Sequence, residues 1–81
     1  MPKPELDDEW KARVRGVLKA EIARRGIKYK DLSATLEELY GVKESPQNLS
    51  NKIARGTFTA IFMFQVLEAI GCQTITLEAS Q

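Results

Sequence analysis

Apolar residues recur at helical spacing in four stretches of this chain. The first stretch places five of them on one side of a helix: Trp10, Val14, Val17, Leu18 and Ile22. This spacing predicts a helix over about residues 8–25. Asp7 is the expected N-cap, and Gly26 is the expected C-cap because glycine adopts the left-handed conformation at little cost.

A second apolar row predicts a helix that starts at residue 28 or 29 and stops at Gly41. Its apolar members are Leu32, Leu36, Leu39 and Tyr40. A short connection follows, and then a third helix. Ser45 is a favourable N-cap, Pro46 suits the first helical position, and Gly56 ends the helix.

The fourth stretch, residues 59–70, is apolar nearly all round and must be covered on most sides. Either the other helices cover it alone or a second subunit covers the remainder. We expect a homodimer through this helix and the C-terminal tail. The alternation over residues 74–77 predicts one short strand, which the same tail of a second subunit would pair. The expected fold is all-α, a compact bundle of four to five helices with a short C-terminal strand.

The 81 residues have room for one domain. We divide it into a flexible lead-in (1–6), a helical core (7–72) and a tail (73–81). Apolar residues make up 43% and charged residues 28%, which is typical of a soluble globular chain. Cys72 is the single cysteine, so no intrachain disulfide can form, and a cytoplasmic location is expected. No signal peptide or membrane-spanning segment is expected.

The inventory of reactive side chains argues against an enzyme. The chain has no histidine, which excludes histidine acid–base catalysis and histidine metal ligands. A single cysteine cannot build a thiolate metal site. No glycine-rich phosphate loop or nucleophile elbow is present. We therefore expect no catalytic residues, no metal, no cofactor and no small-molecule substrate.

Positive charge is concentrated in one part of the chain. The net charge is only +1, but residues 11–30 hold eight Lys or Arg residues against one acid, Glu21. Such a run is either a solvated helix face or part of a nucleic-acid-binding surface. Charge alone leaves both possibilities open.

The third predicted helix carries a row of polar side chains opposite its core face. Gln47, Asn51 and Arg55 stack at successive turns, with Asn48 beside them. Asn and Gln pair with adenine in the major groove, and Arg pairs with guanine. The alternative is an ordinary polar surface helix. If the row binds DNA, these four residues read bases. The residues expected to contact the DNA backbone are Lys28, Tyr29, Lys43, Ser50 and Lys52.

Three segments carry a resemblance to a known family: "LKAEIARRGIKYKDLSATL", "SPQNLSNKIARGTF" and "FQVLEAIGC". In this order they resemble the phage-repressor-like (lambda-repressor-type, xenobiotic-response-element) helix-turn-helix domains. They are more similar still to a group of uncharacterised bacterial domains related to these. The resemblance spans roughly residues 10–72. It implies a bundle of four or five helices, with the third helix in the major groove and often a two-fold dimer.

The chain departs from phage repressors at four places. Leu49 and Ile53 are four residues apart, whereas the matching residues of many phage repressors are three apart. Tyr29 stands where they usually have a phosphate-binding glutamine. One extra helical turn separates Leu32 from Gly41. Ile22 and Ala54 replace a buried arginine–glutamate pair.

Two functions from different classes follow from the sequence. The first is a sequence-specific DNA-binding domain, a bacterial transcriptional regulator that binds double-stranded DNA with its third helix. The alternative is a protein-interaction module on the same fold that does not bind DNA. The near-neutral net charge and three acidic residues favour this alternative: Glu37, Glu38 and Glu44.

Overall fold

The computed structural model describes residues 4–75 and contains four α-helices in that range. They are α1 (Pro4–Arg24), α2 (Tyr29–Tyr40), α3 (Pro46–Arg55) and α4 (Ala60–Ala69). The all-α prediction is confirmed. The expected bounds of α2, α3 and α4 are also confirmed to within a residue at each end. Ser45 and Thr59 cap the starts of α3 and α4, and Gly41 and Gly56 end α2 and α3.

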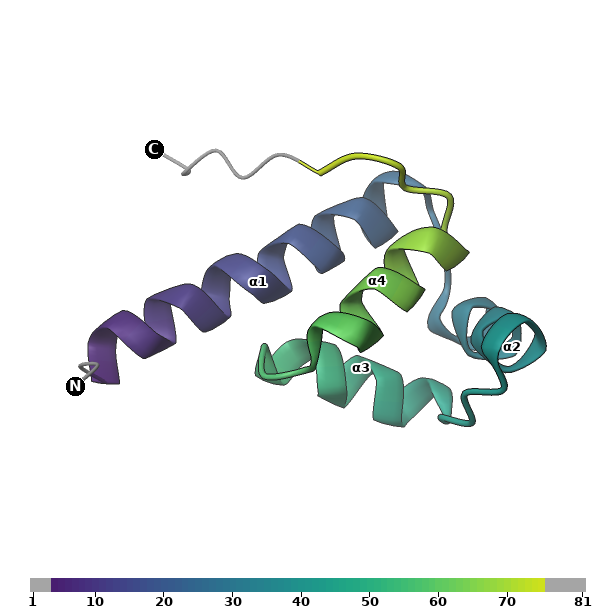
Figure 1. The fold of residues 1–81 in the computed structure, drawn as a ribbon, viewed down its shortest axis with the longest axis horizontal. Helices are drawn as coiled ribbons and strands as arrows, with labels where there is room; N and C mark the ends of the chain where they lie inside the picture. The colour runs from purple at the N-terminus through teal and green to yellow at the C-terminus, as the bar shows by residue number, and fades with distance from the viewer. Residues whose placement is uncertain (1–3, 76–81) are drawn as a thin grey trace.

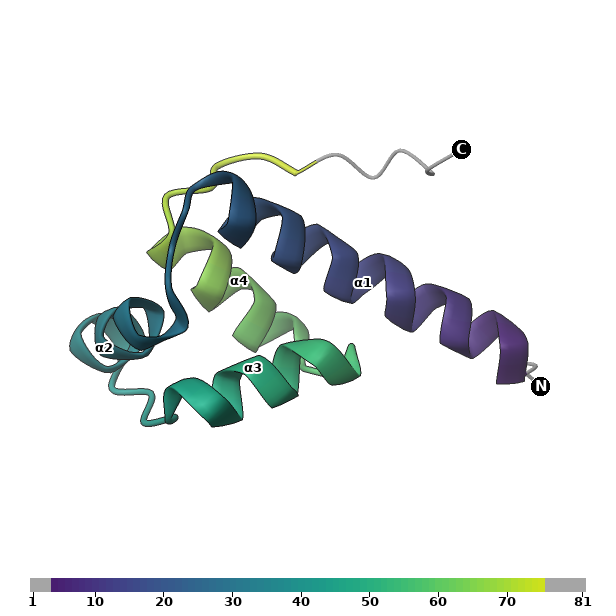
Figure 2. The ribbon, with the colours of Figure 1, turned by 180° about the vertical axis from the view of Figure 1, so that it is seen from behind.

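Helices α3 and α4 each pack against both α1 and α2 (Figures 1 and 2). Helix α1 is the longest, and its N-terminal part extends beyond the other three helices in both views. The C-terminal tail leaves α4 and turns back along α1 as far as the structure describes it.

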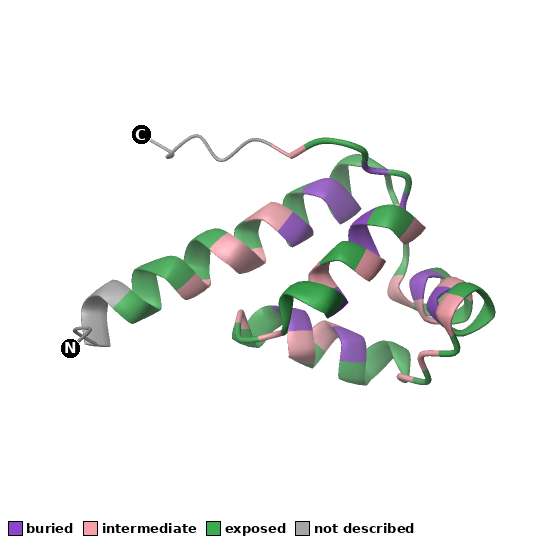
Figure 3. Cartoon of the chain, in the orientation of Figure 1, coloured by how far each residue is buried: buried purple, intermediate pink, exposed green. Residues whose placement is uncertain are grey.

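One cluster of apolar side chains joins all four helices. Its members from the helices are Leu18, Ile22, Leu32, Leu36, Leu49, Ile53, Phe62, Val66 and Leu67, and Ile70 and Cys72 add to it from the segment after α4. In α1 the buried residues lie in the C-terminal half (Figure 3). Trp10, at the other end of the predicted apolar row, is 59% exposed.

Helix α4 is only partly covered by the other helices. Phe62, Val66 and Leu67 are buried, whereas Ile61 and Phe64 are 72% and 68% exposed. These two residues lie one turn apart on the outer face of the helix. Their exposure leaves an apolar surface on α4 without a partner among residues 4–75.

The start of α1 differs from the prediction. The helix begins at Pro4, not near residue 8, so Asp7 lies inside the helix and is not its N-cap. Proline at the first helical position lacks only an N–H that would have no partner there. Asp7 and Asp8 then stand near the positive end of the helix dipole, which favours them. Residues 4–6 of the expected lead-in therefore belong to α1, and residues 1–3 lie outside the described range.

The predicted C-terminal strand is not confirmed. Thr74 and Ile75 form no strand in the described part of the tail. The other two residues of the predicted strand, Thr76 and Leu77, lie outside the described residues. Leu39, expected on the apolar side of α2, is 57% exposed.

Candidate nucleic-acid interface

The candidate site is the outer face of α3. Leu49 and Ile53 are fully buried and fix which side of the helix faces the core. Four predicted base-reading residues share the solvent side: Gln47, Asn48, Asn51 and Arg55. The structure therefore brings together the side chains that the sequence placed in one row.

The N-terminal end of α3 is held by local hydrogen bonds. The Asn48 backbone N–H donates to the Ser45 hydroxyl oxygen over 3.0 Å, and Pro46 occupies the first turn. Both features were predicted from the sequence. They fix where the helix begins, which in turn fixes the direction in which Gln47 and Asn51 point.

The link between α2 and α3 is anchored at Glu44 from two sides. The Ser33 hydroxyl donates to the Glu44 carbonyl oxygen over 2.6 Å, and the Lys52 ammonium lies 2.9 Å from the Glu44 carboxylate. Lys52 also lies over the Phe62 ring, 4.7 Å from its centroid. Sequence reasoning missed this cluster, because residues 33, 44, 52 and 62 have no shared spacing. It ties α3 to the link and to α2, and it places one side chain of α3 over an aromatic ring of α4.

The C-terminal end of α3 abuts α1. Gly56 caps the helix with a φ of +68°. A β-carbon added at Gly56 would lie 2.6 Å from the backbone carbonyl oxygen of Lys11. Only glycine allows this approach of two backbones. Both ends of α3 are therefore fixed by contacts made away from its outer face.

Two amides of the row are joined to each other. The Gln47 side-chain Nε2 donates to the Asn51 Oδ1 over 3.2 Å. Arg55, one turn further on, forms no ion pair with any residue in the described range. Its guanidinium is therefore available to a ligand without breaking an intramolecular bond to another described residue.

The predicted backbone-contacting residues lie in different environments. Lys28 and Lys43 are exposed in the two links that flank α2. Ser50 is half-buried on α3, and Tyr29 packs against the core. Lys52 is held by Glu44, as described above. All five roles stay predictions, and Lys28 and Lys43 are the two with freely exposed charge.

The basic run of α1 is partly neutralised within the chain. Glu21 is buried, and its carboxylate accepts hydrogen bonds from Arg24 and Arg25. The bonds from Arg24 and then Arg25 hold the pKa of Glu21 below its ordinary value of 4.5. Lys11 pairs with Asp7 at 3.2 Å. The spacings of three and four residues were visible in the sequence, but the burial of Glu21 was not.

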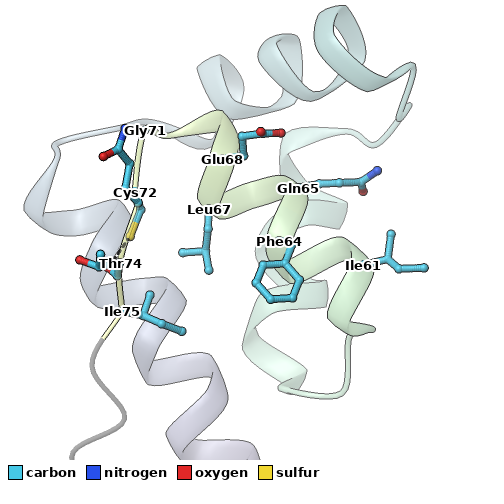
Figure 4. Close-up of a pocket in the computed structure, with 10 residues that line it drawn as sticks. Ile61, Phe64, Gln65, Leu67, Glu68, Gly71, Cys72, Thr74 and Ile75 are labelled. Carbon is cyan, nitrogen blue, oxygen red and sulfur yellow. Dashed lines mark hydrogen bonds between the residues drawn. The ribbon is translucent and has the colours of Figure 1, made fainter.

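A second surface feature, an open groove of about 690 Å³, lies between α4 and the tail (Figure 4). The apolar side chains that line it are Ile61, Phe64, Leu67 and Ile75. The tail is fixed at Cys72, whose backbone N–H donates to the Leu67 carbonyl over 2.9 Å and whose thiol donates to the Thr74 carbonyl. The groove depends on the path of the tail, so helical periodicity could not predict it.

Within residues 4–75, no three histidine, cysteine, aspartate or glutamate side chains gather where a metal ion could bind. None of the four helices in this range combines the length and the apolar character needed to cross a bilayer.

Comparison with known proteins places the chain in one family. Residues 10–75 match the model of a domain of unknown function, DUF6471. The match covers most of the chain, so the chain belongs to this family. No curated protein and no solved structure matches it. Membership in a family of uncharacterised domains is thereby confirmed, whereas the kinship with phage repressors stays a prediction.

Proposed function

We propose that this chain is a sequence-specific DNA-binding domain of the lambda-repressor-like helix-turn-helix type and acts as a transcriptional regulator. The observation that carries the proposal is the exposed row of Gln47, Asn51 and Arg55 on α3. Amides and a guanidinium are the side chains that read base edges in the major groove. The buried Leu49 and Ile53 turn this row outward.

The order of the elements supports the proposal. Helices α2 and α3 pack against each other and are joined by the short link of residues 41–45. Helix-turn-helix proteins have this arrangement: two helices are joined by a short link, and the outer face of the second helix enters the major groove. Glu44, anchored by Ser33 and Lys52, gives this link a fixed shape.

The dimensions of α3 fit the groove. An α-helix with its side chains is about 10–12 Å in diameter, and the major groove is about 12 Å wide. Successive members of the row are four residues apart, or about 6 Å along the helix axis. Base pairs are stacked about 3.4 Å apart, so the row covers roughly four base pairs. On this reading Asn51 pairs with adenine, Arg55 pairs with guanine, and Asn48 lies beside them.

The backbone contacts follow from charge and position. Lys28 and Lys43 are exposed on the links around α2 and supply the phosphate contacts that position the domain. Ser50 and Tyr29 would add hydroxyl donors at the edge of the site. Lys52 would have to exchange the Glu44 carboxylate for a phosphate.

We also propose that the chain forms a homodimer, and the groove on α4 supports this. The surface carries a projecting side chain, Phe64, next to a hollow, and this combination lets it fit a copy of itself about a two-fold axis. Among the residues that line the groove, Glu68 alone is charged, and its carboxylate accepts a hydrogen bond from the Tyr40 hydroxyl. Apposing two copies therefore brings few like charges together.

The dimer is tested by sedimentation across a concentration series. We expect the wild type to associate and Phe64→Ser to stay monomeric. Leu39→Ser is the matched control, because Leu39 is also a largely exposed apolar residue but lies on α2, outside the groove. A wild type that stays monomeric at every concentration would exclude the dimer, as would association that survives Phe64→Ser.

The alternative function is a protein-interaction module without DNA binding. The neutralisation of Arg24 and Arg25 by Glu21 and the exposure of Ile61 and Phe64 favour it. It predicts that the wild type does not bind DNA, even at low salt. The DNA titration described in the next paragraph therefore separates the two functions.

The test of the proposed function is fluorescence anisotropy of labelled mixed-sequence duplex DNA at about 50 and 200 mM salt. Binding should weaken steeply with salt, and Arg55→Glu should abolish it. Arg13→Glu makes the same change of charge on α1, outside the proposed interface, and should retain most of the binding. Failure of the wild type to bind at low salt, or equal losses in the two variants, would refute α3 as the DNA-binding element.

A further inference from the structure

The amides of Gln47 and Asn51 form a hydrogen-bonded pair on the outer face of α3. Both side chains are exposed, and the Gln47 Nε2 lies 3.2 Å from the Asn51 Oδ1. The two residues are one helical turn apart, the spacing at which a glutamine and an asparagine can bond along a helix. Exposed amides gain little stability from such a bond, so its consequence lies in the orientation of Asn51.

The bond selects one orientation of the Asn51 amide. An asparagine that reads adenine must accept from the adenine N6 amino group and donate to N7. A free amide can rotate and exchange the positions of its oxygen and nitrogen. With Gln47 donating to it, the Asn51 oxygen is held toward the N-terminal end of α3 and the amino group is held on the opposite side.

The bonded oxygen keeps its capacity to read a base. A carbonyl oxygen has two lone pairs, so Asn51 Oδ1 can accept from Gln47 and from adenine at once. The Asn51 amino group has two N–H donors, and neither of them is used by Gln47. Asn51 thus has both groups that adenine requires, already set in the correct order.

We propose that Gln47 is a positioning residue that fixes the Asn51 amide, so that the two side chains specify one adenine–thymine base pair together. The inference rests on the proposed function, because it concerns the base that Asn51 reads. It differs from independent reading, in which Gln47 and Asn51 would each specify a base pair about two steps apart.

Asn48 provides the matched control. It is exposed on the same helix and lies three residues from Asn51, but its side chain forms no hydrogen bond with another described residue. Gln47→Met and Asn48→Met each replace an amide by an unbranched side chain that suits a helix. Only the first removes a donor to Asn51.

The first measurement needs no DNA. Three-bond NMR couplings between the β-protons and the side-chain nitrogen of Asn51 report how its amide is turned about the Cβ–Cγ bond in the free protein. We expect the Asn51 amide to be biased toward the bonded orientation in the wild type and in Asn48→Met, and to be more evenly distributed in Gln47→Met. A distribution of Asn51 amide orientations that Gln47→Met leaves unchanged would overturn the inference, whatever the protein does with DNA.

The second measurement is a double-mutant cycle on the preferred duplex and on duplexes with each base pair replaced in turn. Asn51→Ala should cost roughly tenfold or more in affinity and remove the preference at one base pair. Gln47→Met should weaken the preference at that same base pair, and should have no further effect in the Asn51→Ala background.

The outcomes separate this inference from the proposed function. If the wild type binds a preferred duplex but the two losses add and fall on different base pairs, Gln47 reads its own base and the inference is wrong. The proposed function then stands. If the wild type binds no duplex, the proposed function itself fails.

Discussion

Replacing Gly56 by alanine tests how closely α3 is held against α1. Gly56 has a φ of +68°, and an alanine β-carbon would lie 2.6 Å from the Lys11 carbonyl oxygen. Gly41 ends α2 with almost the same φ, +72°, but nothing lies within 4 Å of its added β-carbon. Gly41→Ala is therefore a control that carries the backbone strain without the clash.

The two substitutions should differ by the cost of the clash. A left-handed conformation costs an L-residue about 1–2 kcal/mol, and both variants bear this cost. Ordinary C···O contacts are about 3.3–3.6 Å, so Gly56→Ala must also move two backbones apart by about 0.8 Å. Overpacking of this kind costs about 1–3 kcal/mol. We expect a loss of about 1–2 kcal/mol for Gly41→Ala and about 2–5 kcal/mol for Gly56→Ala.

Urea unfolding followed by circular dichroism measures both losses. A small domain has only about 5 kcal/mol or somewhat more to lose, so Gly56→Ala should shift the midpoint far more than Gly41→Ala. Equal midpoints for the two variants would refute the close approach of α3 to α1. A Gly56→Ala variant that fails to fold while Gly41→Ala folds would agree with it.

Three further substitutions probe other contacts. Gly16→Ala in α1 should raise the free energy of unfolding by up to about 1 kcal/mol. Alanine favours a helix more than glycine does, and its β-carbon would meet no atom within 4 Å. An unchanged or lower melting temperature would contradict this. Ser45→Ala should cost about 1 kcal/mol in urea unfolding by removing the cap that accepts from the Asn48 N–H. The pKa of Glu21 is lowered by Arg24, so its ion pairs stabilise the fold above pH 4.5 and are lost as the pH falls through the lowered pKa. Glu21→Gln should therefore lower the unfolding midpoint at pH 7 and have a shrinking effect in acid, whereas a difference that is independent of pH would contradict this role.

The sequence predicted the parts of the fold that depend on neighbouring residues. Helix α3 is the clearest case, because its cap, first turn and end are marked by Ser45, Pro46 and Gly56 within one short stretch. Its outward row followed from the two core residues, Leu49 and Ile53, through helical geometry alone. The residues of the candidate site could therefore be predicted from the sequence alone.

The features that the sequence did not predict depend on residues far apart in the chain or on burial. The anchoring of Glu44 by Ser33 and Lys52 joins α2, the link and α3, and no spacing indicates it. The exposure of Phe64 and the groove beside it depend on where the tail crosses the bundle. The start of α1 at Pro4 differs from the prediction because Asp7 is a favourable N-cap, whereas Pro4 equally suits a first helical position.

The hydrogen-bonded pair of Gln47 and Asn51 could be predicted from the sequence only in part. Their spacing of four residues was clear from the sequence, and their joint position on the outer face followed from it. The direction of the hydrogen bond between them came from the side-chain arrangement in the structure. This direction makes Gln47 the donor and gives the pair its proposed asymmetry.

The most direct test of α3 as the DNA-reading element is an NMR titration that follows side-chain amides. Signals from Gln47, Asn48 and Asn51 report the outer face of α3, and those from Gln65 and Gln73 report the groove on α4 and the tail. On adding a preferred duplex, we expect the three α3 signals to shift strongly and the two groove signals to move much less. Large shifts at Gln65 and Gln73 with unchanged signals on α3 would contradict the proposed interface.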